Sequence, residues 1–260
     1  MGPLEALVLG VIGGAADFLP ISGSGHRILV GQIFFGRPYD RGFAGACEIS
    51  SALAALVALR REVRGLAVAV SRGDSEGRRI GAMLLLAAAT ATLLSLPFRH
   101  AYLGVSVNLL AVVGVLLLVS GLLLYVAEEL GRRTRLLGSL SPPGALLIGL
   151  LQVLAVLPGI SRQGMAISGG MLVGITREAS TRFALLLSIP LLVVTGLWDL
   201  SAEQSPAGGW VVALGATASF AGGFLAIGFL RWYVREFSLM VFAYYLWVLG
   251  VGAVAYSTLS

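Results

Sequence analysis

A short polar stretch near the N-terminus, residues 19–27, carries the side chains best suited to chemistry. It contains two hydroxyls, an imidazole and a guanidinium, supplied by Ser22, Ser24, His26 and Arg27. A histidine can act as a base, a nucleophile or an acid near neutral pH. Asp17 precedes His26 across the turn and could orient its imidazole or hold a cation. The stretch therefore predicts a site for proton transfer or nucleophilic attack.

A second polar stretch, residues 158–164, contains an arginine within apolar surroundings. Arginine in a membrane is costly and requires an anionic partner. The neighbouring glycines leave backbone N–H groups free, and a helix that begins there would attract phosphate. We therefore expect Arg162 to hold a phosphate group. Further contacts to this ligand are expected from Ser24, Gly25, Arg27, Ser161, Gln163 and Gly164.

The composition identifies an integral membrane protein. Hydrophobic residues make up 57% of the 260 residues and charged residues only 12%, whereas soluble domains carry about 25% charged residues. We expect a single membrane domain over residues 1–260. The net charge of +5 comes from arginines in short loops, which argues against nucleic acid as a partner. The single cysteine, Cys47, excludes an internal disulfide.

The apolar segments that flank the two polar stretches are too short to cross a bilayer, which takes about 20 residues. Pairs of short apolar segments joined by a polar turn are typical of re-entrant hairpins, which require a cover of protein or a wet cavity. Six longer apolar segments are expected to span the membrane as helices, at residues 43–59, 80–96, 103–126, 183–200, 210–230 and 239–256. The predicted fold is all-α, with six transmembrane helices and two re-entrant helical hairpins.

The order of one hairpin followed by three spans occurs twice, which gives one repeat at about 1–127 and another at about 143–260. The two polar stretches align, pairing Ser22 with Ser161 and Gly25 with Gly164. Arginine-rich loops at residues 60–79, 132–135, 177–182 and 231–235 are expected to face the cytoplasm. Because three crossings separate the hairpins, the halves are predicted to be inverted repeats whose hairpin tips meet near the midplane.

Each candidate residue also has a purely structural interpretation. Arg162 could cap helix ends, the serines could be turn and N-cap residues, and His26 could be a satisfied structural histidine. Asp17 and Glu48, a carboxylate inside the next expected span, could form ion pairs with Arg162 or Arg27.

The two polar stretches resemble the signatures of the undecaprenyl-diphosphate phosphatase family, also known as bacitracin-resistance proteins. Residues 13–26 carry the first signature, residues 157–164 and 167–171 carry the second, and the resemblance extends through residues 237–249. It implies hydrolysis of a polyprenyl diphosphate lipid to the monophosphate at the outer face of the cell membrane, by a homodimer. It also implies that His26 and Ser22 serve in attack or proton transfer, and that Arg162 holds the diphosphate.

The first signature departs from the family pattern at the positions credited with a divalent metal. Where the family has two acids or a Gln/Glu pair four residues apart, this chain has Gly13 and Asp17. Glu48 stands where the family usually has glutamine and could supply the missing oxygen. We therefore expect Mg²⁺ or Ca²⁺ to bind at Asp17 and Glu48. Because the first signature keeps only one of its two ligands, the metal is expected to be needed at higher concentration than where both are present.

Two other functions fit the same features. One is a polyprenyl-phosphate carrier or flippase, because inverted repeats are a transporter architecture. The other is a small-anion transporter that uses Arg162 as its binding charge. Release of inorganic phosphate from the diphosphate distinguishes the enzyme from both.

Overall fold

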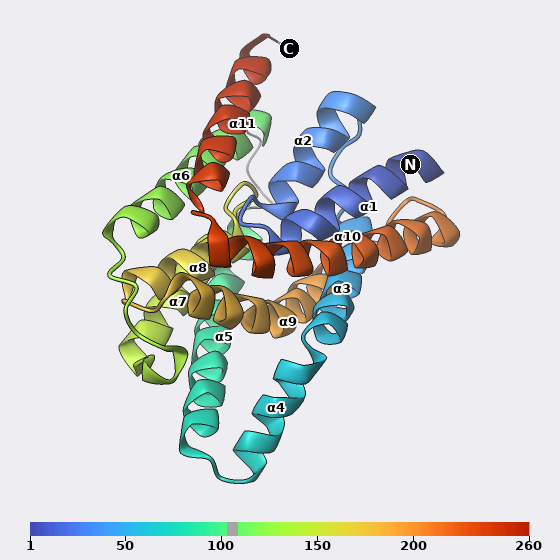
Figure 1. The fold of residues 1–260 in the computed structure, drawn as a ribbon. Coiled ribbons are helices and arrows are strands. Elements are labelled where there is room, and N and C mark those ends of the chain that lie inside the picture. The colour runs from blue at the N-terminus through green and yellow to red at the C-terminus, as the bar shows by residue number, and fades with distance from the viewer. Residues whose placement is uncertain (103–108, 260) are drawn as a thin grey trace.

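The computed structural model describes residues 1–102 and 109–259, and the side chains within these ranges except those of residues 99–102. In this part of the chain, the protein folds into eleven α-helices and one short 3-10 helix (Figure 1). Six helices are long and apolar enough to cross a membrane. They are α3 (Arg41–Ala58), α5 (Ser75–Tyr102), α6 (Leu109–Leu130), α9 (Arg177–Ala202), α10 (Gly209–Glu236) and α11 (Met240–Leu259).

These six helices confirm the prediction of a multi-pass helical membrane protein with six long apolar segments. The expected break near Pro97 is wrong, because α5 continues through this proline to Tyr102. A proline removes one backbone hydrogen bond but does not oblige a long helix to end. Residues 103–108, where the third span was expected to begin, lie outside the described residues.

Four shorter helices carry the two polar stretches. The helices α1 (Pro3–Phe18) and α2 (Gly23–Phe35) pack against each other, as do α7 (Pro142–Leu154) and α8 (Arg162–Leu172). They contain 16, 13, 13 and 11 residues, fewer than the roughly 20 that a crossing takes. Their lengths agree with the short apolar segments expected on either side of each polar stretch.

The first polar stretch is mostly helical rather than a turn. Only residues 19–22 lie between α1 and α2, and residues 23–27 form the first turns of α2. The helix begins here because the Ser22 hydroxyl caps it, accepting a hydrogen bond from the backbone N–H of Gly25 at 3.2 Å. Ser161 caps α8 in the same way, accepting from the Gly164 N–H at 3.0 Å. The N-cap interpretation of both serines is therefore confirmed.

The charged segment expected as a loop over residues 60–79 contains a helix instead, α4 (Arg60–Ser71). It packs against α5, and the two project from the body of the protein on the side away from the C-terminus (Figure 1). Another expected loop contains the 3-10 helix η1 (Leu137–Ser139).

The core helices approach one another closely through small residues. A Cβ atom added at Gly10 of α1 would lie 2.3 Å from the Gly215 carbonyl oxygen of α10, and one at Gly14 would lie 2.1 Å from the Ser219 carbonyl oxygen. Such small residues let helix backbones pack directly in a membrane. The helix α3 packs against both α9 and α10, α5 packs along α7, and α6 packs along α11.

The four arginine-rich segments lie at one end of the protein. Buried Glu128 accepts hydrogen bonds from Arg133 at 3.0 Å, from Ser238 at 2.9 Å and from Arg177. Ion pairs also join Arg231 to Glu62 at 2.6 Å and Arg235 to Glu178 at 3.3 Å. These contacts tie segments 60–79, 132–135, 177–182 and 231–235 together.

A second set of contacts marks the other end. The Ser205 hydroxyl donates to Asp40 at 2.6 Å, and Arg41 pairs with Asp199 at 3.1 Å. Because α3 runs from Arg41 to the arginine-rich end, these contacts lie at the end of the helix bundle away from the arginine-rich segments.

The two polar turns are in contact, as the sequence predicts. A Cβ atom at Gly25 would lie 3.2 Å from the Gly159 Cα, and one at Gly164 would lie 3.7 Å from the Pro20 Cβ. The two segments that carry the candidate chemistry therefore meet inside the protein.

Candidate functional site

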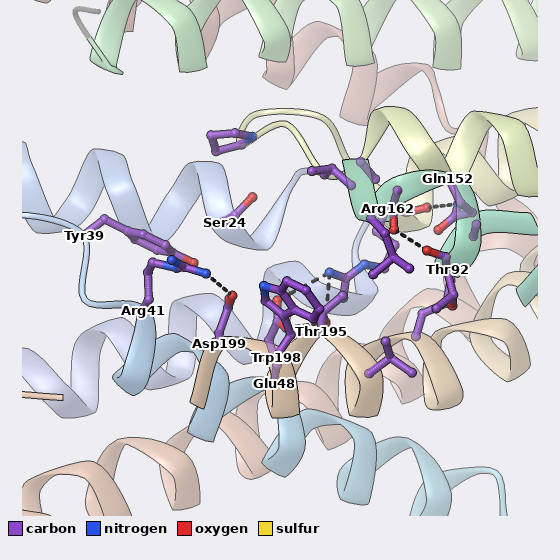
Figure 2. A pocket seen from close by; sticks show the side chains of 18 of the residues that line it. Ser24, Tyr39, Arg41, Glu48, Thr92, Gln152, Arg162, Thr195, Trp198 and Asp199 are labelled. Atoms are coloured by element: carbon purple, nitrogen blue, oxygen red, sulfur yellow. Dashed lines mark hydrogen bonds and ion pairs between the residues drawn. The ribbon is translucent and has the colours of Figure 1, made fainter. Parts of the chain in front are cut away.

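A cavity of about 360 Å³ lies beside the two polar turns (Figure 2). Its wall is built by α2, α3, α5, α6, α7, α8 and α9, together with residues between these helices. Small-molecule sites commonly measure about 300–1,000 Å³. The polar side chains of the wall come from Ser24, Tyr39, Arg41, Glu48, Thr92, Ser95, Gln152, Arg162, Thr195 and Asp199.

Arg162, the first residue of α8, points toward α3 and α9 (Figure 2). Its Nη2 lies 3.4 Å from Glu48 Oε1 and 3.4 Å from Thr195 Oγ1, and the Thr195 hydroxyl also donates to Glu48. Glu48 and Thr195 therefore fix one edge of the guanidinium. The contacts made by the described residues leave the other N–H groups of Arg162 able to donate to an anion in the cavity.

The turn before α8 is locked by its own hydrogen bonds. Gly159 has a φ of +109° and its added Cβ would lie 2.7 Å from the Val113 carbonyl oxygen, so only glycine fits there. Ser120 donates to the Gly159 carbonyl at 3.1 Å and accepts from the Ser161 N–H at 2.9 Å. The Gln152 side chain of α7 donates to the Arg162 carbonyl at 2.8 Å. These bonds fix where α8 begins and so where the Arg162 guanidinium lies.

Asp17 and Arg27 form a second, more deeply buried ion pair. Arg27 Nη2 lies 2.7 Å from Asp17 Oδ2, and the two side chains are 3% and 4% exposed. The Ser51 hydroxyl donates to the same carboxylate oxygen at 2.9 Å. Ser51 lies three residues after Glu48 on α3, about one helical turn away. The predicted ion pairs of both carboxylates with arginines are therefore confirmed, and the two pairs are neighbours.

The expected divalent cation finds little support in this arrangement. Asp17 and Glu48, the two predicted ligands, each bind an arginine. Among the described residues, no group of three or more His, Cys, Asp or Glu side chains could hold a metal ion. The residues present do not fit a divalent cation, although the need for one stays a prediction.

His26 is buried next to the cavity rather than in its lining. Its Nδ1 lies 2.8 Å from the Ser22 carbonyl, which can only accept, so Nδ1 carries the proton. Nε2 then has a lone pair and accepts from the Tyr245 hydroxyl of α11 at 2.7 Å. The histidine is thus held in one tautomer, with its reactive nitrogen covered by a phenol. None of the hydrogen bonds among the described side chains joins it to Arg162 or Asp17.

The structure brings Ser24, Glu48 and Arg162 into one cavity, and it places the Asp17–Arg27 pair and His26 around them. Ser22, predicted to serve in attack or proton transfer, and Ser161, predicted as a ligand contact, have structural roles here, since their hydroxyls cap helices. Gln163 is 1% exposed, and neither atom of its amide has a hydrogen-bond partner among the described groups.

Several residues of the site were not predicted from the sequence. Asp199 lies inside an expected span, where an ionisable residue indicates function, so this signal was available. Gln152 was also visible, because the alignment of the two polar stretches pairs it with Gly13. Thr195 and Tyr245 carry no comparable signal, since hydroxyls are common in apolar helices and only the tertiary fold brings these two to the site.

Six candidate spans around a cavity with charged walls define a multi-pass helical membrane protein with a buried polar site. Residues 6–252 match the family model described as bacitracin resistance protein BacA. The chain is 33% identical to an undecaprenyl-diphosphatase of Thermobifida fusca, covering 96% of this chain and 89% of the relative. It is 35% identical to one of Rubrobacter xylanophilus, covering 95% of each chain. The chain therefore belongs to the bacitracin resistance protein BacA family.

Proposed function

We propose that the protein hydrolyses undecaprenyl diphosphate to the monophosphate and inorganic phosphate. The observation that carries this proposal is Arg162 at the N-terminus of α8, with one guanidinium edge fixed by Glu48 and Thr195 beside a cavity among membrane helices. A diphosphate requires positive charge and N–H donors, and this position offers both. The undecaprenyl-diphosphatases among the relatives give the substrate class.

In the proposed reaction, the bond between the terminal phosphorus and the bridging oxygen breaks. The oxygen that replaces it comes from water, directly or after formation of a covalent intermediate, and the bridging oxygen leaves on the lipid monophosphate. Arg162 donates to the non-bridging oxygens and stabilises the charge that develops on them. His26 has an unprotonated Nε2 and is the group suited to take the proton of water or to attack phosphorus. Ser22 is less suited, because its hydroxyl caps α2.

We infer that the reaction occurs at the outer face of the cell membrane, where it would recycle the lipid carrier of cell-envelope glycan synthesis. Tyr39, Arg41, Trp198 and Asp199 line the cavity near the end without the arginine-rich segments. The positive-inside rule assigns the arginine-rich end to the cytoplasm. The homodimer stays a prediction from the family resemblance.

Phosphate release by the purified protein tests the proposed hydrolysis. The protein in detergent or lipid vesicles should release inorganic phosphate from undecaprenyl diphosphate, with the lipid monophosphate as the other product. A carrier would instead move lipid phosphate between the leaflets of a vesicle without release. Absence of release in chelator and at every divalent cation concentration would contradict an enzyme.

We further propose that residues 1–127 and 143–260 are inverted repeats, each with one re-entrant hairpin. The support is the order of elements, since the spans α3, α5 and α6 separate two pairs of short helices whose turns touch. An odd number of crossings places the hairpins on opposite faces.

Cysteine labelling of intact cells tests this topology. In a Cys47→Ala background, an impermeant maleimide should label Pro38→Cys, next to the first hairpin, and Gln204→Cys. It should not label Ser71→Cys or Thr134→Cys, next to the second hairpin, until the cells are permeabilised. All four positions are exposed in the structure. Labelling of residue 134 from outside would show that both hairpins enter from one face.

A further inference from the structure

The Arg27 side chain fills the space beside Gly13, the position where the family signature is expected to have an acid or a glutamine. A Cβ atom at Gly13 would lie 2.1 Å from Arg27 Nε and 2.7 Å from its Cζ. Any side chain at position 13 would therefore collide with the guanidinium, which is 3% exposed and has little room to move. The Arg27 guanidinium can occupy this position only because residue 13 is a glycine and has no side chain.

The Arg27 guanidinium has more hydrogen-bonding capacity than its partners use. Asp17 accepts from Nη2, but buried Nε and Nη1 have no hydrogen-bond partner among the described residues. Arginine stays charged in proteins, and a buried donor without an acceptor destabilises the folded state. Nε faces Gly13, whereas Nη1 lies on the other side of the guanidinium, so a phosphate oxygen that reached Nη1 would satisfy that donor and meet a positive charge.

The Asp17–Arg27 pair lies close enough to the cavity for its charge to act there. Arg27 lies three residues after Ser24 on α2, about one helical turn away, and Ser24 lines the cavity. Asp17 accepts from Ser51, which lies three residues after Glu48 on α3, and Glu48 pairs with Arg162 at the cavity. In a region of low dielectric, charges at such separations interact strongly.

We propose that Arg27 supplies the fixed positive charge that neutralises the diphosphate in this chain, in place of a divalent cation. This inference rests on the proposed hydrolysis and names a further residue of the same site. Charge neutralisation by an arginine requires no metal ligands. This agrees with the structure, in which the carboxylates of Asp17 and Glu48 both bind arginines. The competing interpretation is that Arg27 only neutralises Asp17 and has no effect on the substrate.

The first test uses the unaltered protein, so it carries no risk of misfolding. Phosphate release from undecaprenyl diphosphate is measured in excess EDTA and then with graded Mg²⁺ or Ca²⁺. We expect the rate in EDTA to lie within about twofold of the best rate with metal, because the protein itself supplies the charge. A rate that falls to background in EDTA and returns with metal would overturn the proposal.

A matched pair of glycine variants tests the space around Arg27 without altering its charge. Gly13→Ala places a methyl group against the guanidinium, whereas Gly228→Ala in α10 has nothing within 4 Å of the added Cβ. We expect Gly13→Ala to lower kcat at least about tenfold, since small displacements of a charge-stabilising group have large effects on rate. Gly228→Ala should retain the original rate. Equal rates for the two variants would overturn the proposal.

A charge-free pair separates catalysis from folding. Arg27→Gln alone would leave Asp17 buried without a counter-charge, which strongly destabilises the folded protein. Asp17→Asn/Arg27→Gln removes both charges and should fold, with its thermal unfolding as the check. We expect this variant to lose phosphate release at least about a hundredfold and to gain nothing from Mg²⁺. Retained release would assign Arg27 a structural role only and overturn the proposal.

Metal binding gives a readout that does not depend on turnover. Terbium luminescence should show no site in the unaltered protein and a site in Gly13→Glu/Arg27→Leu, where a carboxylate pair replaces the arginine. A terbium site in the unaltered protein that Ca²⁺ displaces would overturn the proposal. Release that requires metal would reject the role of Arg27 and leave the hydrolase standing, whereas no release under any condition would reject both.

Discussion

Arg162→Lys is expected to lower kcat/KM for phosphate release from undecaprenyl diphosphate by about a hundredfold or more. In the structure, one nitrogen of the guanidinium contacts Glu48 and Thr195, and the other N–H groups remain able to meet the substrate. A lysine is a point charge on a flexible stem, so it can pair with Glu48 or with phosphate but cannot reproduce the planar set of donors.

The matched control for this variant is Arg64→Lys on the exposed helix α4, which should retain the original rate. Both exchanges keep the net charge and both leave helix propensity nearly unchanged, so only the position differs. A loss of less than about threefold in Arg162→Lys would mean that charge alone suffices at the start of α8. The proposed planar contact between Arg162 and phosphate would then be wrong.

Much of the fold could be predicted because the membrane imposes strong rules on sequence. Apolar segments of sufficient length identify all six candidate spans, and serines before glycine-rich helices mark the starts of α2 and α8. These rules do not predict helices in strongly charged segments, because they identify helices by their apolar residues. The helix α4 carries three arginines within its first five residues. This charge density predicts a loop between apolar spans, although arginine is a good helix former.

The candidate site was predictable as far as its residues lie in the two polar stretches. Both ion pairs were foreseen as alternatives, because buried carboxylates and buried arginines require partners. The sequence could not show that Arg27 fills the space beside Gly13, since that depends on how α1 packs on α2. It also could not show that Tyr245, which is 219 residues from His26, covers the imidazole.

These details change the interpretation of the departures in the first signature. From the sequence, Gly13 is a missing ligand and Asp17 a shortened one. In the structure, Asp17 has an arginine as its partner, and the glycine is what allows that arginine to enter. The departures therefore belong to one arrangement of neighbouring groups. Under the role proposed for Arg27 they replace the metal, whereas the sequence alone predicts weaker metal binding. The effect of these departures on catalysis also depends on which group takes up the proton during hydrolysis.

His26→Ala is expected to lower turnover by about 10²–10⁴-fold while leaving lipid binding largely intact. Its Nε2 is unprotonated, and Ser24, two residues before it on α2, lines the cavity. The substrate contacts assigned to Arg162 do not involve His26. Turnover is measured by phosphate release at saturating lipid. Binding is measured separately, by retention of undecaprenyl diphosphate on the immobilised protein.

Tyr245→Phe separates a chemical role of this histidine from a structural one. The variant removes the hydroxyl that donates to Nε2 but keeps the ring that stacks on the imidazole at 5.7 Å. If Nε2 acts on the substrate or on water, the phenol hydrogen bond must be broken in each turnover, so its loss should change the rate by about tenfold or less. If His26 only anchors α2 to α11, both variants should lower thermal stability and lose binding and turnover together. Equal loss of binding and turnover in His26→Ala would therefore exclude a proton-transfer role and leave the arginines as the catalytic groups.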